Sequence, residues 1–170
     1  MSRDKVAVVL VEDNYEDLEL HYPRLRLIEA GFKVQVVGPE KKVYKSKFGY
    51  WATCDTTFAE VDPSKVAVLV VPGGWAPDRL RRFPECVALV AGCHKAGAVI
   101  GHICHGGSLA VSARILKGVK STSFPSIKDD LELAGAVWVD ERVVSDQRIV
   151  SAQTPEDLPG FMREILKLVQ

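Results

Sequence analysis

The stretch that decides the fold lies between residues 98 and 107 and reads Ala98-Val99-Ile100-Gly101-His102-Ile103-Cys104-His105-Gly106-Gly107. Its first six residues are mostly apolar, as in a strand that is buried on both faces of a sheet. Paired glycines directly after such a strand permit a sharp turn. The residues 106–116 then have helical spacing and end before Gly118. The stretch therefore predicts a buried strand that turns at once into a helix.

The same unit recurs along the chain. Besides the strand at 98–103, β-branched runs at 5–11, 32–37 and 66–71 predict three more buried strands. Helical spacing or helix-end signals predict helices over 16–30, 84–96, 106–116, 127–133 and 155–169. In the first helix the apolar stripe is expected at Leu18, Tyr22, Leu25 and Ile28, with a kink at Pro23.

Buried strands that alternate with helices indicate a mostly parallel sheet covered on both faces. We therefore expect one domain over residues 1–170, an α/β protein with a flavodoxin-like three-layer α/β/α sandwich. The alternating polar segments 42–57 and 141–151 are expected as short antiparallel pieces at the edges of the sheet. In such sheets ligands bind at the carboxyl ends of the strands, so the loops there hold the candidate site.

The composition excludes several classes of protein. The chain has 22 basic and 22 acidic residues, a balance that gives no support to nucleic-acid binding. Its hydrophobic content of 47% is that of an ordinary globular protein. The apolar runs are too short for a membrane span, and residues 1–5 lack the layout of a signal peptide, so a cytoplasmic protein is expected.

Four cysteines, at positions 54, 86, 93 and 104, have neither the spacing of a disulfide scaffold nor that of a zinc site. Cys86 and Cys93 are seven residues apart on one predicted helix, which is core spacing, and Cys54 lies in an alternating strand. Nearby, Arg79, Arg81 and Arg82 are best explained as a solvated face. We expect no metal and no cofactor.

Cys104 stands where the strand meets the glycine pair, an arrangement that resembles a nucleophile elbow. A helix N-terminus can lower the pKa of a cysteine, and its free N–H groups can bind an oxyanion. His105 is a candidate base. The alternative is an inert buried cysteine, and local sequence leaves both readings open.

Two other loops leave the same end of the sheet. Residues 70–78 contain Gly73-Gly74, which suits either an anion cradle or a simple tight turn. Residues 12–17 are acidic, and most of their carboxylates are explained by helix capping. A carboxyl beside the thiol would instead move or hold its proton. Spacing alone does not say whether Glu12, Glu16 or Glu19 would be that carboxyl.

Several ordered motifs together make the chain resemble the PfpI family of intracellular cysteine peptidases. That family lies in the superfamily of the parkinsonism-linked protein deglycase and the class I glutamine amidotransferase-like domains. The resemblance runs from Val6 to Leu168. It rests on Tyr15-Glu16-Asp17-Leu18-Glu19-Leu20, Pro72-Gly73-Gly74 with Ala76-Pro77-Asp78, Ile103-Cys104-His105-Gly106, Thr122-Ser123-Phe124-Pro125-Ser126-Ile127-Lys128-Asp129-Asp130 and Phe161-Met162-Arg163-Glu164.

The resemblance implies roles for particular residues. Cys104 takes the position of the nucleophile, His105 that of the adjacent histidine, and Glu16 that of the acid that contacts the thiol. Gly74 and the backbone of His105 fall where the family forms its oxyanion hole. Asp78 stands where peptidase-like members carry a glutamate that reaches the histidine of a neighbouring subunit, so a homo-oligomer is expected.

Four departures from the family pattern bear on this site. Asp78 is one methylene shorter than the glutamate, and His102 stands where a small residue is usual. Gly107 replaces a frequent proline. Phe124 and Gln153 stand where relatives often have tyrosine and arginine.

Three functions are open, and the resemblance implies the first two. The leading one is a cysteine-dependent hydrolase or lyase of glyoxalase or deglycase type, which takes a small carbonyl compound or a glycated protein or peptide as substrate. The second is an intracellular peptidase with a Cys–His–acid triad completed between subunits. The third is a non-enzymatic sensor of oxidative stress that works through Cys104 oxidation.

Overall fold

The structure, a computed structural model, describes residues 6–169, and the expected features of residues 1–5 lie outside the described part. A sheet in the order β10-β11-β7-β6-β1-β2-β5 forms its centre. All neighbouring pairs are parallel except β10 with β11. Its strands are β1 (Val6–Leu10), β2 (Lys33–Gly38), β5 (Thr56–Thr57), β6 (Val66–Val71), β7 (Val99–Ile103), β10 (Val143–Asp146) and β11 (Ile149–Ala152). The expected α/β sandwich is confirmed.

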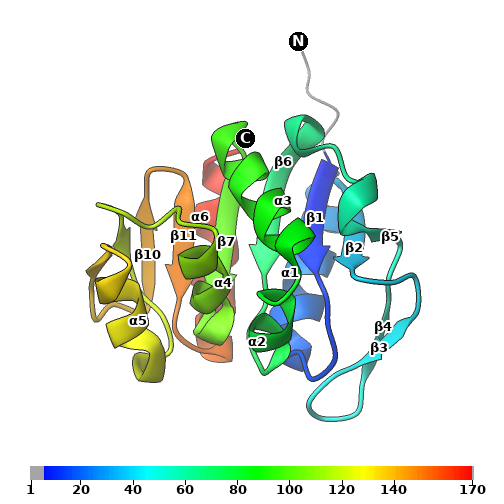
Figure 1. Ribbon diagram of the computed structural model, residues 1–170, viewed down its shortest axis with the longest axis horizontal. Helices are drawn as coiled ribbons and strands as arrows, with labels where there is room; N and C mark the ends of the chain where they lie inside the picture. Colours follow the sequence, from blue (N-terminus) through cyan, green and yellow to red (C-terminus); the bar gives the residue numbers. More distant parts are fainter. Residues whose placement is uncertain (1–5, 170) are drawn as a thin grey trace.

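Helices cover both faces of the sheet, with α3 and α4 in front of it and α1 and α6 behind it in Figure 1. The helices are α1 (Asp17–Glu29), α2 (Ala76–Leu80), α3 (Pro84–Lys95), α4 (Gly107–Ser112), α5 (Lys128–Leu133) and α6 (Leu158–Lys167). The 3₁₀ turns are η1 (Phe58–Glu60), η2 (Pro63–Lys65), η3 (Cys104–Gly106), η4 (Pro125–Ile127) and η5 (Pro155–Asp157). Helix α2 was expected as part of a loop, and α4 is shorter than its apolar spacing indicated.

Two small sheets lie outside the central one. The segment 42–57 contains the antiparallel pair β3 (Val43–Lys45) and β4 (Trp51–Thr53), which forms a separate hairpin. The parallel pair β8 (Lys120–Ser121) and β9 (Val137–Trp138) was not expected. The segment 141–151 does supply the antiparallel edge strand β10, although β11 beside it is parallel to β7.

Helix α1 buries a different face from the one expected. Its buried residues are Glu19, Leu20, Pro23 and Leu27. Three members of the expected stripe, Leu18, Leu25 and Ile28, are between 46% and 58% exposed. The helix is assigned as one continuous element through Pro23. The spacing argument found the helix and chose the wrong side, because both sides carry residues at three-to-four intervals.

The loops that leave the carboxyl ends of the strands come together at one end of the sheet. Figure 1 shows α2 and the β3–β4 hairpin at the end towards which the β1, β6 and β7 arrows point. Tyr15 forms isolated β-bridges with Ser46 and Gly74, which tie the loops after β1 and β6 to the hairpin. The site expected at this end is therefore built from loops that contact each other directly.

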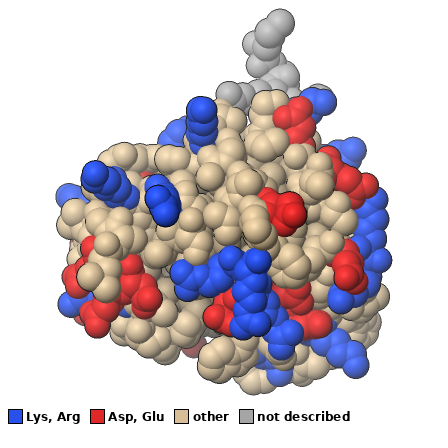
Figure 2. All heavy atoms as spheres, in the orientation of Figure 1, with Lys and Arg blue, Asp and Glu red and all other residues tan. Residues whose placement is uncertain are grey.

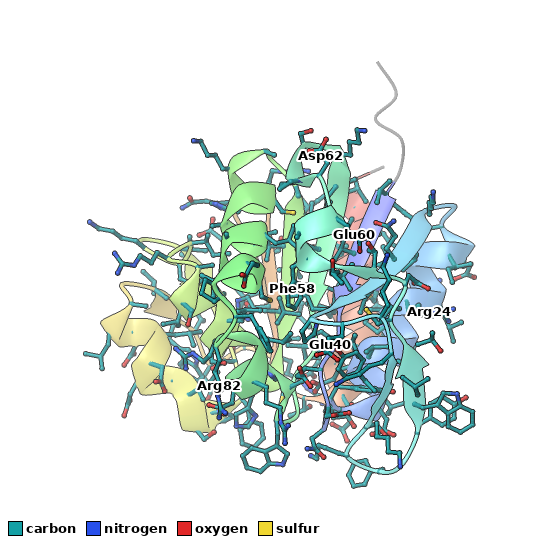
Figure 3. All side chains as sticks on the ribbon, turned by 45° about the vertical axis from the view of Figure 1, so that its right-hand side comes forward. Arg24, Glu40, Phe58, Glu60, Asp62 and Arg82 are labelled. Atoms are coloured by element: carbon teal, nitrogen blue, oxygen red, sulfur yellow. The ribbon has the colours of Figure 1, made fainter. Side chains whose placement is uncertain are left out.

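The surface carries both signs of charge, and Figure 2 shows basic and acidic side chains interspersed over one face. Arg82 pairs with Asp78 one turn away on α2, and Figure 3 shows Arg82 at the carboxyl end of the sheet. Arg81 donates to the Ser112 hydroxyl at 2.9 Å.

Within residues 6–169 no helix is long and apolar enough to cross a membrane.

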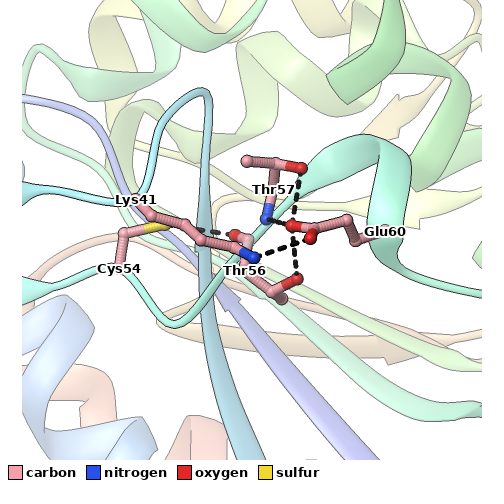
Figure 4. Close-up of polar contacts among 5 residues, drawn as sticks. All are labelled: Lys41, Cys54, Thr56, Thr57 and Glu60. Carbon is pink, nitrogen blue, oxygen red and sulfur yellow. Dashed lines mark hydrogen bonds and ion pairs between the residues drawn. The ribbon is translucent and has the colours of Figure 1, made fainter.

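Three of the four cysteines are structural, as expected. Cys86 and Cys93 are fully buried in α3, and burial raises the pKa of both thiols. Cys54 follows β4, where its Sγ donates to the carbonyl of Thr56 at 3.1 Å. Figure 4 shows that contact beside the hydrogen bonds with which Glu60 caps η1. Across the described residues no cluster of three potential metal ligands is present.

Candidate active site

Cys104 is the first residue of the 3₁₀ turn η3, which joins β7 to α4. Its φ of 57° is in the left-handed region, which is rare for a residue with a side chain and concentrates at functional sites. Gly106 makes the turn possible, because a Cβ at this position would come within 2.4 Å of the Val71 carbonyl oxygen. The elbow expected from the sequence is therefore present, with a half-buried cysteine at its apex.

The loop after β6 lies against this elbow. A Cβ on Gly73 would be 2.5 Å from Glu19 Oε2 and 2.8 Å from the Cys104 Cβ. Gly74 has a φ of 75°, and a Cβ there would meet the Asn14 carbonyl oxygen at 2.5 Å. The two glycines allow three loops to approach each other more closely than side chains would permit.

The carboxyl that hydrogen-bonds the Cys104 thiol belongs to Glu19, which corrects the assignment of that position to Glu16. Glu16 is the N-cap of α1, and its Oε2 accepts a hydrogen bond from the Glu19 N–H at 3.0 Å. Glu19 is fully buried, and its Oε2 accepts from the Gly73 N–H at 2.7 Å. Its Oε1 is buried with no hydrogen-bond partner among the described residues. The third candidate, Glu12, accepts from the N–H of Asp13.

Burial and charge perturb Glu19 and Cys104 together. Burial, followed by the charge of Glu16, raises the pKa of Glu19 to about 8, so its carboxyl is protonated at neutral pH. Burial, followed by the charge of an ionised Glu19, raises the pKa of Cys104. The expectation of a lowered thiol pKa is therefore wrong for the resting site, because removal from water outweighs the helix terminus. The buried pair accommodates at most one negative charge.

Two backbone groups oppose this rise. The N–H groups of His105 and Gly74 both hydrogen-bond the Cys104 sulfur and lower its pKa. They are the groups at which the resemblance located an oxyanion hole. Both therefore point to the place where negative charge would develop on sulfur or on an oxygen bonded to the attacked carbon.

The His105 ring contacts groups on two of its edges. Its Nδ1 lies 3.3 Å from Cys104 Sγ, and its Nε2 lies 3.2 Å from the Ser126 hydroxyl. The Phe124 ring stacks on the imidazole with centroids 5.1 Å apart, and the Trp75 ring lies 6.4 Å away. Burial, followed by the charge of Lys47, lowers the pKa of His105. The imidazole is therefore neutral at pH 7 and free to accept a proton.

Asp78 does not contact His105 within the chain. It lies on α2 with its carboxylate largely exposed and bound to Arg82 at 2.6 Å. Its expected contact with a neighbouring subunit stays a prediction. Sequence reasoning left Ser126, Trp75 and Lys47 without a role, although Ser126 lies inside the quoted motif 122–130.

His102 is fully buried two residues before the nucleophile. Its Nε2 lies 3.1 Å from the Ser121 hydroxyl, its Nδ1 has no hydrogen-bond partner among the described residues, and burial lowers its pKa to about 4. A Cβ on Gly107 would be 3.3 Å from this Nδ1, so the absence of a side chain there makes room for the ring.

Gln153 follows β11 at the strand end beside that of β7, because Ala152 pairs with Ile103. Its side-chain amide donates to the Thr122 hydroxyl and to Asp140, both at 3.0 Å. Phe124, the other departure of this kind, is the residue that stacks on His105.

Comparisons with known proteins show the family of the chain. The profile described as the DJ-1/PfpI family matches residues 4–168. Deglycase PfpI of Pyrococcus furiosus is 42% identical over 161 residues, 95% of this chain and 97% of the relative. Protein/nucleic acid deglycase 2 of Escherichia coli is 36% identical over 168 residues, 97% of this chain and 98% of the relative.

Two solved structures show the same fold. A two-domain protein of Anabaena variabilis with DJ-1/ThiJ/PfpI-like and ferritin-like domains superposes with a TM-score of 0.94 at 34% identity. The match covers 96% of this chain and 47% of that longer one. Drosophila melanogaster DJ-1beta superposes with a TM-score of 0.90 at 25% identity, over 98% of this chain and 90% of that one.

Proposed function

Because the chain belongs to the DJ-1/PfpI family, we propose that it is a cysteine-dependent enzyme that removes reactive carbonyls or their adducts on proteins and peptides. Relatives that align over nearly the whole chain are named deglycases, which supports an enzyme of this kind. The observation that carries the proposal is the surrounding of Cys104. A strained elbow holds its sulfur against a neutral imidazole, two N–H groups and a protonated carboxyl.

The first step is the activation of the thiol. His105 Nδ1, 3.3 Å from Cys104 Sγ, accepts the thiol proton, because the ring is neutral and this nitrogen can accept. Glu19 keeps its own proton, so the thiolate does not face a second negative charge. The N–H groups of Gly74 and His105 stabilise the sulfur anion until it reacts.

The second step is addition to the carbonyl. The sulfur lone pair forms a bond to the aldehyde carbon, and the C=O electron pair moves to oxygen. Glu19 donates its proton to that oxygen, which gives a hemithioacetal on Cys104. The Gly74 and His105 N–H groups lie next to the oxygen while it carries charge.

For methylglyoxal the rest of the cycle is an isomerisation followed by hydrolysis. The Glu19 carboxylate removes the proton from the aldehyde carbon and returns it to the adjacent ketone carbon. The hydroxyl proton of the hemithioacetal passes to the former ketone oxygen, which leaves a lactoyl thioester on Cys104. Water attacks the thioester carbon and gives a proton to the Glu19 carboxylate, and the departing Cys104 sulfur takes back the proton that His105 received, which releases lactic acid. The sum is methylglyoxal plus water to lactic acid, with no external oxidant or reductant.

The test compares methylglyoxal consumption and lactate release by the wild type and by Cys104→Ser. We expect a loss of at least about 100-fold, the usual minimum when a positioned nucleophile or proton carrier is removed. Cys54→Ser is the matched control, because the hydroxyl can keep the bond to the Thr56 carbonyl. Equal rates in the wild type and in Cys104→Ser would refute the mechanism.

Peptidase activity is the alternative. It requires a third residue that orients His105 and completes a Cys–His–acid triad. The carboxylate expected in that role, Asp78, is bound to Arg82 within the chain. This observation favours the carbonyl reaction for a single subunit. Casein degradation that depends on Cys104 would favour the peptidase.

A further inference from the structure

Ser126 occupies the edge of His105 that faces away from the nucleophile. The Ser126 hydroxyl is 3.2 Å from His105 Nε2, while Cys104 Sγ is 3.3 Å from Nδ1 of the same ring. The three side chains therefore form a continuous series, thiol to imidazole to hydroxyl. All three come from one chain.

The backbone keeps this serine in place. Ser126 lies in the 3₁₀ turn η4, which begins at Pro125 and follows Phe124. The Phe124 N–H donates to the Cys104 carbonyl at 3.2 Å, and its ring stacks on His105. One short segment thus binds the elbow through its backbone, covers the imidazole with a ring, and presents a hydroxyl to Nε2.

We propose that Ser126 is a positioning residue that holds the His105 imidazole with its Nδ1 towards Cys104, and that it does so within a single subunit. This inference rests on the proposed function, because it concerns the residue that accepts the thiol proton. It places the orienting group on the same chain, where the sequence alone led us to expect Asp78 of a neighbour.

A hydroxyl suits this task in every protonation state of the ring. Before the reaction Nδ1 is the acceptor for the thiol proton, so Nε2 carries hydrogen and donates to the Ser126 oxygen. After transfer, the S–H bond has broken and the new N–H bond is on Nδ1. The imidazolium still donates from Nε2 to the same oxygen, because the hydroxyl oxygen accepts in both states. Ser126 moves no proton and fixes only the orientation and the tautomer.

The experiment measures steady-state methylglyoxal kinetics for Ser126→Ala and Ser126→Thr. We expect Ser126→Ala to lower kcat by about 3- to 10-fold, the range that corresponds to one ordinary hydrogen bond, with KM unchanged. Ser126→Thr keeps the hydroxyl and is expected to restore kcat. Ser145→Ala, an exposed serine on the edge strand β10, is the control for the loss of a surface hydroxyl.

A spectroscopic readout separates positioning from general damage. The ¹⁵N shifts of the His105 ring should report the Nε2–H tautomer in the wild type and a mixture of tautomers in Ser126→Ala. Unchanged kcat and an unchanged tautomer in Ser126→Ala would overturn the inference. A loss of activity in Asp78→Asn with none in Ser126→Ala would overturn it too, because the orienting group would then be the carboxylate.

The variant Cys104→Ser distinguishes this failure from failure of the function itself. If Cys104→Ser is inactive and Ser126→Ala is fully active, only the positioning role is wrong. If Cys104→Ser retains full activity, the proposed function is wrong and the tautomer measurement alone decides the role of Ser126.

Discussion

Replacing Glu19 with glutamine tests whether the carboxyl beside the nucleophile is protonated. Glutamine has nearly the same shape and keeps an oxygen for the Gly73 N–H, which now donates to Glu19 Oε2 at 2.7 Å. The substitution therefore removes the titration of this group and leaves its main hydrogen bond. It also removes the proton that the proposed mechanism gives to the substrate oxygen, so catalysis should fall while the fold persists.

The pKa sets the size and sign of the effect on stability. Burial raises the pKa of Glu19 from 4.5 to about 8 in the folded protein. Between these values the folded state binds a proton that the unfolded state has released, so raising the pH costs the wild type about 1.4 kcal/mol per unit. The stabilising effect of the proton is complete below pH 4.5 and is lost as the pH rises through about 8. The whole change is at most about 5 kcal/mol.

The assay is equilibrium urea unfolding of the wild type and Glu19→Gln at pH values from 5 to 9. We expect the variant to gain stability relative to the wild type steadily up to about pH 8 and no further. Glu29→Gln, at an exposed position of the same helix, is the control for a Glu-to-Gln substitution on α1. A difference between wild type and Glu19→Gln that does not vary with pH would refute a protonated Glu19.

Two further predictions follow from the buried groups around the site. Burial lowers the pKa of His102 from 6.5 to about 4, so its contribution to stability is present above pH 6.5 and is lost as the pH falls towards 4. Unfolding measured at pH 7 and 4.5 should show a loss in the wild type that is about 2–3 kcal/mol larger than in His102→Gln. Mild peroxide should oxidise Cys104 before Cys86 or Cys93, which are fully buried, as mass spectrometry of digested protein would show. Earlier oxidation of either buried cysteine would contradict both the stress-sensor alternative and the claim that Cys104 is the reactive thiol.

The sequence was sufficient for the main elements of the fold. The strands observed as β1, β2, β6 and β7 lie within one residue of the expected runs, because a strand buried on both faces must be almost wholly apolar. The helix after β1 was predicted from apolar residues at three-to-four spacing and from Gly31 after its end. Its buried face was not, since the sequence offers one stripe through Leu18 and Leu25 and another through Leu20 and Leu27. Only the position of the sheet decides between them.

The resemblance led to Glu16 as the acid beside the thiol, whereas spacing had left Glu12, Glu16 and Glu19 open. Glu16 and Glu19 are three apart, so both lie near one side of the helix. Glu16 has extended backbone angles as the N-cap, and its side chain turns back to satisfy the N–H of Glu19. Glu19 is inside the first turn and faces the sheet, where it meets Gly73. The residue at which α1 begins decides which glutamate faces the thiol. Helix boundaries are difficult to predict from a sequence.

The glycines carry information that spacing does not. Gly73 and Gly106 each stand where a Cβ would collide with an atom from a different loop or strand, namely Glu19 and Val71. A paired glycine after a strand therefore indicates that another segment approaches, without saying which one. Here the segments after β1 and β6 bring Glu19 and the Gly74 N–H to Cys104, whose own turn supplies His105. The chemistry of the thiol thus depends on the order of strands in the sheet, and a substitution that separates these loops should abolish it even if the side chains of the site are kept.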